Sequence, residues 1–174
     1  MEMNYCRRCG SALTHKGGHV YTCANSHTIF ANASPTVGVF FLTPDNTVLL
    51  SVRGIDPGKG LYDSFGGFVD GIETLESAYE RELAEELGLK PGDYEEPVYL
   101  TSGTGYYRFS GEKVPVLSVF YWSRLTPGVK PMPADDVAEI VELSLDDIDY
   151  ETIHNDDVKA GMRALQDLFQ KENS

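Results

Sequence analysis

The sequence predicts an α/β domain that follows a small segment rich in cysteine, histidine and glycine. Three observations support this prediction: β-rich runs from residue 36 onward, a strongly patterned helix in mid-chain, and an amphipathic helix near the end. The length of 174 residues gives room for one ordinary domain and a small appendage. The hydrophobic content of 41% is ordinary for a globular protein.

Short β-branched and aromatic runs, separated by turn residues, predict the strands. Residues 44–46 (Pro-Asp-Asn) form one predicted turn, and residues 110–113 (Ser-Gly-Glu-Lys) form a hairpin turn. The predicted strands cover residues 36–43, 47–53, 61–65, 97–107, 114–125 and 139–144. The predicted helices cover residues 74–87, 145–150 and 156–171, the last beginning after the start signal Asn155-Asp156-Asp157.

The helix over 74–87 is predicted from its periodicity and its ends. Its apolar residues recur every four positions, at Leu75, Tyr79, Leu83 and Leu87, so one stripe should face a core. Thr74 is a suitable N-cap, and Gly88 is a suitable C′ residue.

Three carboxylates, those of Glu82, Glu85 and Glu86, fall within an arc of roughly 100° on this helix. Like charges in such an arc repel each other, and a hard divalent cation such as Mg²⁺ or Mn²⁺ reverses that cost. Gly66 and Gly67, just upstream, let the backbone turn sharply beside a ligand. The pattern therefore favours a metal site that holds a diphosphate over a plain solvated acidic helix.

Residues 67–89 carry glycines, acids, an arginine and aliphatic residues at every position of one long pattern. This stretch resembles the Nudix box, the signature of the Nudix hydrolases. The resemblance implies an α/β/α sandwich with a mixed β-sheet. It also implies hydrolysis, with Mg²⁺ or Mn²⁺, of a nucleoside diphosphate linked to another group.

The same resemblance implies roles for individual residues. Glu82, Glu85 and Glu86, together with the carbonyl of Gly66, are expected to bind the catalytic metal. The two remaining charged positions of the box, Glu73 and Arg81, are expected to form an ion pair that orients the helix. The family does not fix which carboxylate takes the proton of the attacking water.

The amino-terminal segment predicts a zinc site. Cys6 and Cys9 form a CxxC knuckle, and Cys23 follows. Ser26 stands where a second CxxC would have its cysteine, so the neighbouring His27 is expected to complete the site. The alternatives are His15, His19 and a degenerate, metal-free segment. The segment resembles the zinc ribbon of the NADH pyrophosphatases, which implies a structural Zn²⁺ and three parts: residues 1–30 as ribbon, 31–35 as linker and 36–174 as Nudix domain.

The substrate is less defined. The two-part layout favours NADH or a related dinucleotide, but the motif S-Q-P-W-P-F-P-x-x-S of NADH pyrophosphatases is missing from residues 101–109, so ADP-ribose and other ADP-linked compounds stay open. Tyr106 and Tyr107 are candidates for stacking on a base, or for packing on the sheet. Arg53 is a candidate for a local basic patch.

Acids outside the box are candidates for an extra metal ligand or general base. Glu139 is preferred because it precedes the last predicted strand, and the others are Glu112, Asp135 and Asp136. His154 stands alone in the sequence and is expected to be a surface or packing histidine.

The formal net charge of −13 argues against a nucleic-acid or anionic-membrane partner, so a small nucleotide is the expected partner. The sequence shows no signal peptide or transmembrane run, and its cysteine number is odd, which favours a cytoplasmic location. A homodimer is expected from the resemblance alone. Two other hypotheses are a sensor that binds ADP-ribose or a dinucleotide without cleaving it, and an interaction protein whose ribbon docks a partner.

Overall fold

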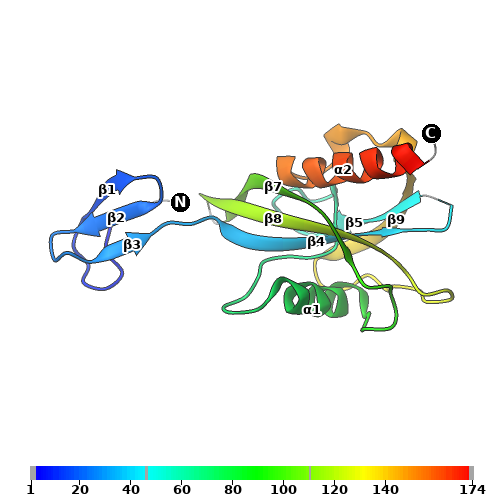
Figure 1. Ribbon diagram of the computed structural model, residues 1–174, viewed down its shortest axis with the longest axis horizontal. Coiled ribbons are helices and arrows are strands. Elements are labelled where there is room, and N and C mark those ends of the chain that lie inside the picture. Colours follow the sequence, from blue (N-terminus) through cyan, green and yellow to red (C-terminus); the bar gives the residue numbers. More distant parts are fainter. Residues whose placement is uncertain (1–2, 46, 110, 173–174) are drawn as a thin grey trace.

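The computed structural model describes residues 3–45, 47–109 and 111–172, which form a small sheet and a larger layered body (Figure 1). The small sheet is antiparallel and contains β1 (Leu13–Gly17), β2 (Val20–Cys23) and β3 (Thr28–Phe30) in that order. Among the described residues of this segment, the buried cluster consists of Ile29, Cys6 and Cys23. So little apolar burial cannot stabilise a segment of this size by itself.

The larger body is built on a six-stranded mixed sheet. Its strands are β4 (Ser34–Leu42), β5 (Thr47–Arg53), β6 (Tyr62–Asp63), β7 (Val98–Phe109), β8 (Glu112–Arg124) and β9 (Val137–Ser144). The order is β6-β5-β4-β8-β7, and β9 pairs with β5. Only β4 and β8 run parallel, over nine residue pairs, and the other pairings between these strands are antiparallel.

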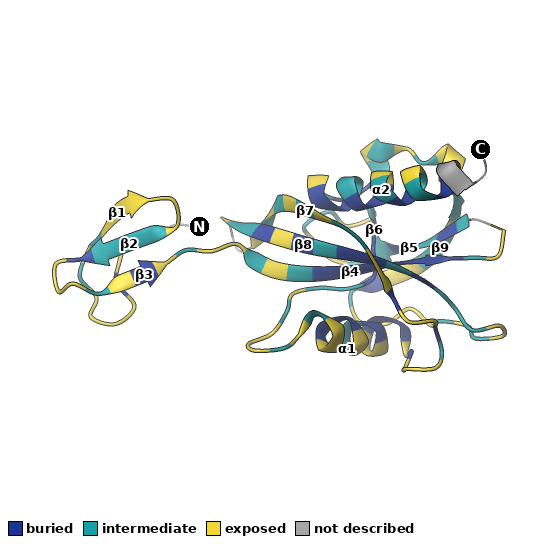
Figure 2. Cartoon of the chain, viewed as in Figure 1, coloured by how far each residue is buried: buried dark blue, intermediate teal, exposed yellow. Residues whose placement is uncertain are grey.

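One helix covers each face of this sheet (Figure 1). Helix α1 (Leu75–Leu87) buries Leu83 and Leu87 against one face, and α2 (Asp156–Glu172) buries Met162 and Leu165 against the other. The buried residues of both helices line the sheet (Figure 2). The predicted α/β/α sandwich with a mixed sheet is therefore confirmed.

The ends of α1 are those that the sequence predicts. The hydroxyl of Thr74 accepts a hydrogen bond from Ser77 N at 3.2 Å, and Gly88 adopts a left-handed conformation with φ 66°. These caps satisfy backbone groups that a helix leaves unpaired at its ends.

The predicted strand over 61–65 is different in the structure. Tyr62 and Asp63 pair with β5, whereas Phe65 pairs with Val39 of β4. The chain crosses between neighbours at Ser64, where a Cβ on Gly38 would lie 2.4 Å from the serine Oγ. The crossing lays the glycine turn at residues 66–67 directly against β4.

Two smaller differences concern the linker and the predicted helix over 145–150. Strand β4 begins at Ser34, within the segment predicted as a linker, and Ser34 pairs with Val116. The predicted helix over 145–150 is a pair of 3₁₀ turns, η1 (Leu145–Asp147) and η2 (Tyr150–Thr152). The predicted turns at 44–46 and 110–113 each include a residue, 46 or 110, outside the described part of the chain.

None of the helices in the described part of the chain combines the length and the apolar composition needed to cross a bilayer.

Replacing Leu83 by alanine should lower the free energy of unfolding by about 2–5 kcal/mol, because it leaves a cavity in the core between α1 and the sheet. Leu117→Ala is the matched control, since Leu117 is 44% exposed and should change the stability little. Urea unfolding of both variants measures the difference. Equal midpoints for the two would contradict the packing of α1 described here.

Candidate active site and zinc site

Two consecutive glycines bring the backbone of residues 66–67 against the carboxylates of α1. Gly66 N donates a hydrogen bond to Glu86 Oε2 at 2.8 Å. A Cβ on Gly67 would lie 2.5 Å from Glu82 Oε1, so no larger residue fits there without displacing that carboxylate. On the other side, Val37 N donates to Gly67 O at 2.9 Å, which ties the turn to β4.

Gly66 is required by its conformation as well as by space. Its φ of 139° lies in a region that residues with a side chain rarely adopt, and a Cβ there would lie 2.3 Å from Val37 O. The backbone next to the acidic helix therefore depends on both glycines.

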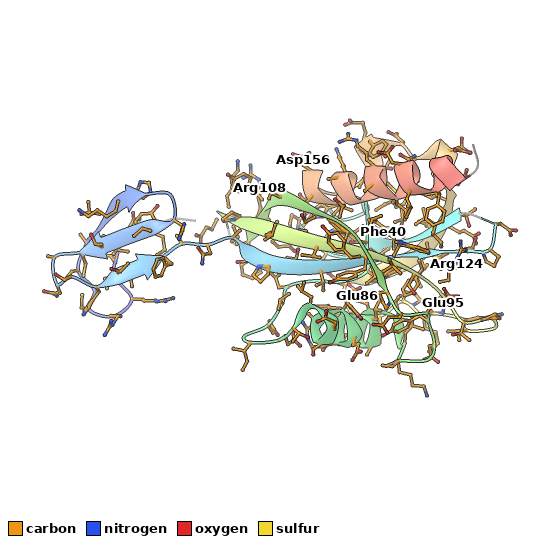
Figure 3. All side chains as sticks on the ribbon, in the orientation of Figure 1. Phe40, Glu86, Glu95, Arg108, Arg124 and Asp156 are labelled. Carbon is orange, nitrogen blue, oxygen red and sulfur yellow. The ribbon has the colours of Figure 1, made fainter. Side chains whose placement is uncertain are left out.

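The three box glutamates differ in burial. Glu86 is only 4% exposed and points from α1 toward the sheet (Figure 3), and the side chain of Glu82 is 13% exposed. The side chain of Glu85 is 51% exposed at the open side of the same arc. The arrangement gives two enclosed carboxylates and one that faces solvent.

Arg81 joins the acids of the box. Its guanidinium donates to both carboxylate oxygens of Glu73, at 2.9 and 3.1 Å, and to Glu82 Oε1 at 2.8 Å. It also reaches Glu85 Oε2 at 3.1 Å and the carbonyl of Phe68 at 2.9 Å. Hydrogen bonds from Arg81, followed by the one from Asp70 N, lower the pKa of Glu73. Arg81 thus connects both ends of the loop, at Phe68 and Glu73, to the acids of the helix.

Asp136 adds a further acid beside Glu86. Its loop is fixed on both sides, since Ala134 N donates to Glu86 O at 2.8 Å and Gly54 N donates to Asp136 O at 2.6 Å. Burial, followed by the charge of Asp136 and a hydrogen bond with it, raises the pKa of Glu86 to about 10 in the metal-free protein. Burial also raises the pKa of Glu82. Buried carboxylate oxygens of this kind suit a hard divalent cation. On binding, the cation would displace the proton that Glu86 holds next to Asp136.

Not all the predicted substrate and base residues lie near these acids. Glu139 is exposed on β9 and pairs with Val52, so the nearby acid from this region is Asp136. Tyr106 is 60% exposed, with Lys113 Nζ 5.4 Å from its ring centroid. Tyr107, on the opposite face of β7, lies in a pocket next to the glycine turn. Strand alternation separates the two tyrosines, and their sequence alone does not say which one faces inward.

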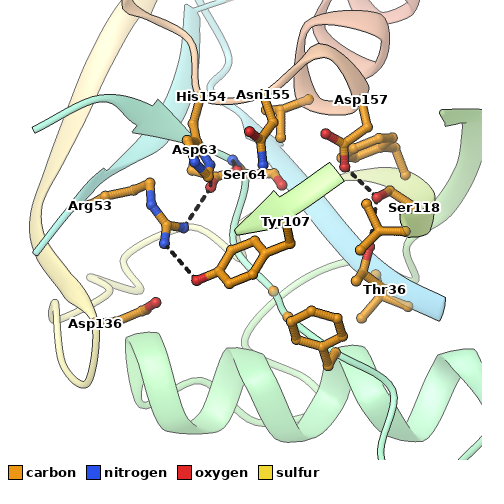
Figure 4. Close-up of a pocket in the computed structure, with 17 residues that line it drawn as sticks. Thr36, Arg53, Asp63, Ser64, Tyr107, Ser118, Asp136, His154, Asn155 and Asp157 are labelled. Atoms are coloured by element: carbon orange, nitrogen blue, oxygen red, sulfur yellow. Dashed lines mark hydrogen bonds and ion pairs between the residues drawn. The ribbon is translucent and has the colours of Figure 1, made fainter. Parts of the chain in front are cut away.

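The pocket has a volume of about 130 Å³ and lies between the glycine turn, β7 and the start of α2 (Figure 4). On one side, Asp63 Oδ2 accepts from Arg53 at 2.9 Å and lies 3.1 Å from His154 Nδ1. Arg53 also donates to the Tyr107 hydroxyl at 3.2 Å. Arg53 therefore orders the pocket wall and is not a free surface cation.

His154 is not a surface residue: it is 5% exposed. Its ring fits because position 58 is a glycine, where a Cβ would lie 2.3 Å from His154 Cδ2. Its contact with Asp63 joins residues far apart in the chain, so no local pattern indicates it.

The predicted zinc residues converge at the end of the small sheet. The ligand atoms of Cys6, Cys9, Cys23 and His27 all lie within 4.8 Å of one another. Cys9 Sγ is 3.7 Å from Cys23 Sγ, and Cys6 Sγ is 3.6 Å from His27 Nδ1. Ligands about 2.3 Å from a tetrahedral Zn²⁺ are about 3.8 Å apart, so the set fits this ion.

The surroundings of this cluster favour a thiolate at Cys9. The hydroxyl of Ser11, 3.5 Å from Cys9 Sγ, and then the Ser11 backbone lower the pKa of Cys9 to about 5. The thiolate is the form that binds metal. The alternative histidines point elsewhere: His15 Nε2 bonds Gly18 O at 2.9 Å, and the ring of His19 packs on Phe30.

A family model for the NUDIX domain matches residues 33–164, which include the glycine turn, α1, the pocket and the first half of α2. The chain belongs to the Nudix family. The match begins next to the first residue of β4 and leaves out the small three-stranded sheet.

Curated Nudix relatives match over part of their length. The NAD-capped RNA hydrolase NUDT12 of Homo sapiens is 30% identical over 98 residues, covering 51% of this chain and 21% of that protein. NAD-capped RNA hydrolase NudC of Deinococcus radiodurans is 29% identical over 90 residues, covering 49% and 32%. The ADP-ribose pyrophosphatase of Methanocaldococcus jannaschii is 49% identical over 47 residues, covering 27% and 28%. The matched regions thus span about a fifth to a third of these relatives.

Solved structures share the fold. A NUDIX hydrolase from Nitrosomonas europaea superposes with a TM-score of 0.68 at 19% identity, covering 98% of this chain and 93% of that one. The NUDIX domain of NrtR from Shewanella oneidensis, complexed with ADP ribose, has a TM-score of 0.61 at 23% identity, covering 80% and 90%.

Binding of Mn²⁺ near neutral pH should release a proton. The pKa of Glu86 is about 10 without metal, so the group is protonated there and must lose its proton to coordinate. Affinity should therefore increase as the pH increases toward that value. Calorimetry in buffers of different ionisation enthalpy measures the release. Glu86→Gln should reduce the proton release, because it removes the group with the highest pKa, while Glu80→Gln, at an exposed position of the same helix, should leave it unchanged. A heat of binding that is independent of the buffer would contradict this account.

The protein purified without chelator should contain about one Zn²⁺ per chain, as measured by elemental analysis. His27→Ala should lower that content, because it removes one of four clustered ligands. His19→Ala replaces an exposed histidine outside the cluster and should leave the content unchanged. Full zinc occupancy in His27→Ala would remove this histidine from the proposed ligand set.

Proposed function

We propose that the protein is a metal-dependent pyrophosphohydrolase that cleaves the diphosphate of NADH, ADP-ribose or a similar ADP-linked compound. The observation that carries this proposal is the convergence of Glu82, Glu86 and Asp136 beside the glycine turn, with Glu85 at the open side. Several buried acids in contact are unfavourable unless a cation shares them.

The proposed ligands for Mg²⁺ or Mn²⁺ are Glu82, Glu85, Glu86 and the carbonyl of Gly66. When bound, such a cation neutralises phosphate oxygens and makes a coordinated water a nucleophile near neutral pH. Arg81 orients Glu82 and Glu85 through direct hydrogen bonds, and Glu73 fixes the guanidinium from its other side. Ion pairs of this kind keep metal ligands in position, which is why they affect metal affinity.

The substrate class is inferred from the relatives and from the pocket. The curated relatives are named for ADP-ribose or for NAD caps, which share a diphosphate attached to adenosine. The pocket of about 130 Å³ is smaller than the roughly 300–1,000 Å³ that encloses a drug-sized ligand, so it suits one end group of such a compound.

A small nucleotide is the proposed substrate rather than a capped RNA. The formal net charge of −13 opposes binding of a long polyanion, and a single diphosphate needs only the local cation. We further propose a cytoplasmic location and a homodimer. A sensor that does not hydrolyse its ligand is disfavoured, because every acid of the box is present.

The proposed role of the small sheet is structural. Four ligands from Cys6, Cys9, Cys23 and His27 would fill a tetrahedral Zn²⁺ and leave no position for a substrate. Zinc would then supply the stability that the small core around Ile29 lacks.

The test is turnover of ADP-ribose, NADH and related ADP-linked compounds with Mg²⁺, before and after Glu82→Gln. The substitution keeps the shape of the side chain but removes a charged ligand, so kcat should fall about 100-fold or more. Glu80→Gln is the matched control at an exposed position of the same helix and should retain the rate. Equal rates for Glu82→Gln and Glu80→Gln would refute the role given to Glu82.

A further inference from the structure

The three cysteines of the small sheet differ in their access to solvent. Cys6 and Cys23 are only 2% and 8% exposed, whereas Cys9 is exposed. Its chain neighbours Arg8 and Gly10 are exposed as well, so the turn that carries Cys9 faces water. Oxidation of cysteine depends on such exposure, and a reagent in solution therefore reaches the sulfur of Cys9 before it reaches the other two.

A second sulfur lies beside the exposed one. Cys9 Sγ is 3.7 Å from Cys23 Sγ, although the two residues are 14 positions apart in the chain. A disulfide bond is about 2.05 Å long, so the two sulfurs need to approach each other by less than about 2 Å. Cys6 has a different neighbour, since its Sγ lies 3.6 Å from His27 Nδ1. The pair of Cys9 and Cys23 thus combines an exposed sulfur with a near partner.

The same two sulfurs belong to the proposed zinc site, on which this inference rests. A disulfide no longer offers thiolates, so joining Cys9 to Cys23 removes two of the four clustered ligands. Cys6 and His27 remain, and two ligands do not fill a tetrahedral site. The apolar core around Ile29 is small, so the segment loses most of its stability together with the metal.

The consequence of losing zinc is confined to one end of the molecule. Strands β1, β2 and β3 form a sheet of their own, separate from the six-stranded sheet that α1 covers. Only residues 31–33 lie between the end of β3 and the start of β4 (Figure 1). The small sheet can therefore open without disturbing the packing of the larger body.

We propose that Cys9 is a modification site for hydroperoxides, and that its oxidation to a disulfide with Cys23 releases the bound zinc. The Cys9 thiolate attacks a peroxide oxygen, the O–O bond breaks, and the departing oxygen takes a proton and leaves as water or an alcohol. The Cys23 thiolate then attacks the sulfur of the resulting sulfenic acid and displaces hydroxide, which takes a second proton and leaves as water. The two sulfurs lose two electrons and the peroxide gains them, while Zn²⁺ keeps its charge throughout.

The experiment treats the zinc-loaded full chain with hydrogen peroxide. A chromogenic chelator measures the released metal, intact-mass spectrometry measures the oxidation, and peptide mapping locates the bond. We expect release of about one Zn²⁺ per chain, a mass lower by about 2 Da than that of the reduced chain, and a peptide pair joined through Cys9 and Cys23. Dithiothreitol followed by added Zn²⁺ should restore both the mass and the zinc content.

Cys9→His and Cys6→His are matched variants, because each exchanges one thiolate for an imidazole, which is also a zinc ligand. Cys9→His lacks the exposed sulfur and should release zinc at least about tenfold more slowly than the wild-type protein. Cys6→His keeps both sulfurs of the pair, so peroxide should still join Cys9 to Cys23 and release the metal. Zinc analysis before oxidation checks that each variant is loaded, and the peptide map of the wild-type protein decides alone if one is not.

Zinc that stays bound while all three cysteines stay reduced overturns the proposal. A disulfide from Cys6 to either of the other cysteines also overturns it, as does sulfinic acid at Cys9 without a disulfide. A chain purified without zinc overturns the release step together with the zinc site, and the same map still tests the sulfur pair. Hydrolysis of ADP-linked compounds is not among these measurements, so a failure here is distinct from a failure of the proposed enzymatic function.

Discussion

The close approach of residues 66 and 67 to helix α1 determines where the acidic groups of this protein can lie. The turn is bonded to β4 through Val37 and to α1 through Glu86, and its two glycines leave no room for a side chain on either side. Beneath it, Phe65 and Leu83 belong to one core, so the sheet and the helix cannot shift independently. Carboxylates on a helix are thereby held against backbone, with little freedom to move apart.

This packing places the carboxylates of Glu82, Glu85, Glu86 and Asp136 close enough to repel one another. Arg81 offsets part of the repulsion by bonding three of the acids, but it does not reach the deepest pair, Glu86 and Asp136. Burial, followed by the charge of Asp136, raises the pKa of Glu86, which favours the protonated carboxyl in the metal-free protein. The clustered acids therefore lower the stability of the fold, and the packing holds their oxygen atoms together in advance.

Local features of the fold were predictable from the sequence, and features that depend on distant contacts were not. The caps at Thr74 and Gly88 and the four-residue apolar repeat define α1, because these signals act within one or two turns. The cysteine spacing likewise indicates the cluster with His27. The crossing of the chain at Ser64 depends instead on a glycine in another strand, Gly38, which no local pattern around residue 64 reveals.

The same distinction applies to the candidate site. The box acids follow from one continuous motif, whereas Asp136 lies beside Glu86 through backbone bonds from Gly54 and Ala134. The burial of His154 depends on Asp63 and Gly58, some 90 or more residues earlier in the chain. The exposed position of Glu139 opposite Val52 likewise depends on strand pairing, which no local pattern around residue 139 reveals.

The glycine turn is also a boundary shared by the pocket and the acidic cluster, and this has a consequence for how the protein can diversify. Because main chain fixes the spacing between the two, side chains on the far wall of the pocket can be exchanged without moving Gly66 and Gly67 away from Glu86 and Glu82. The shape of the pocket and the arrangement of the acidic cluster can therefore vary separately in descendants of this sequence.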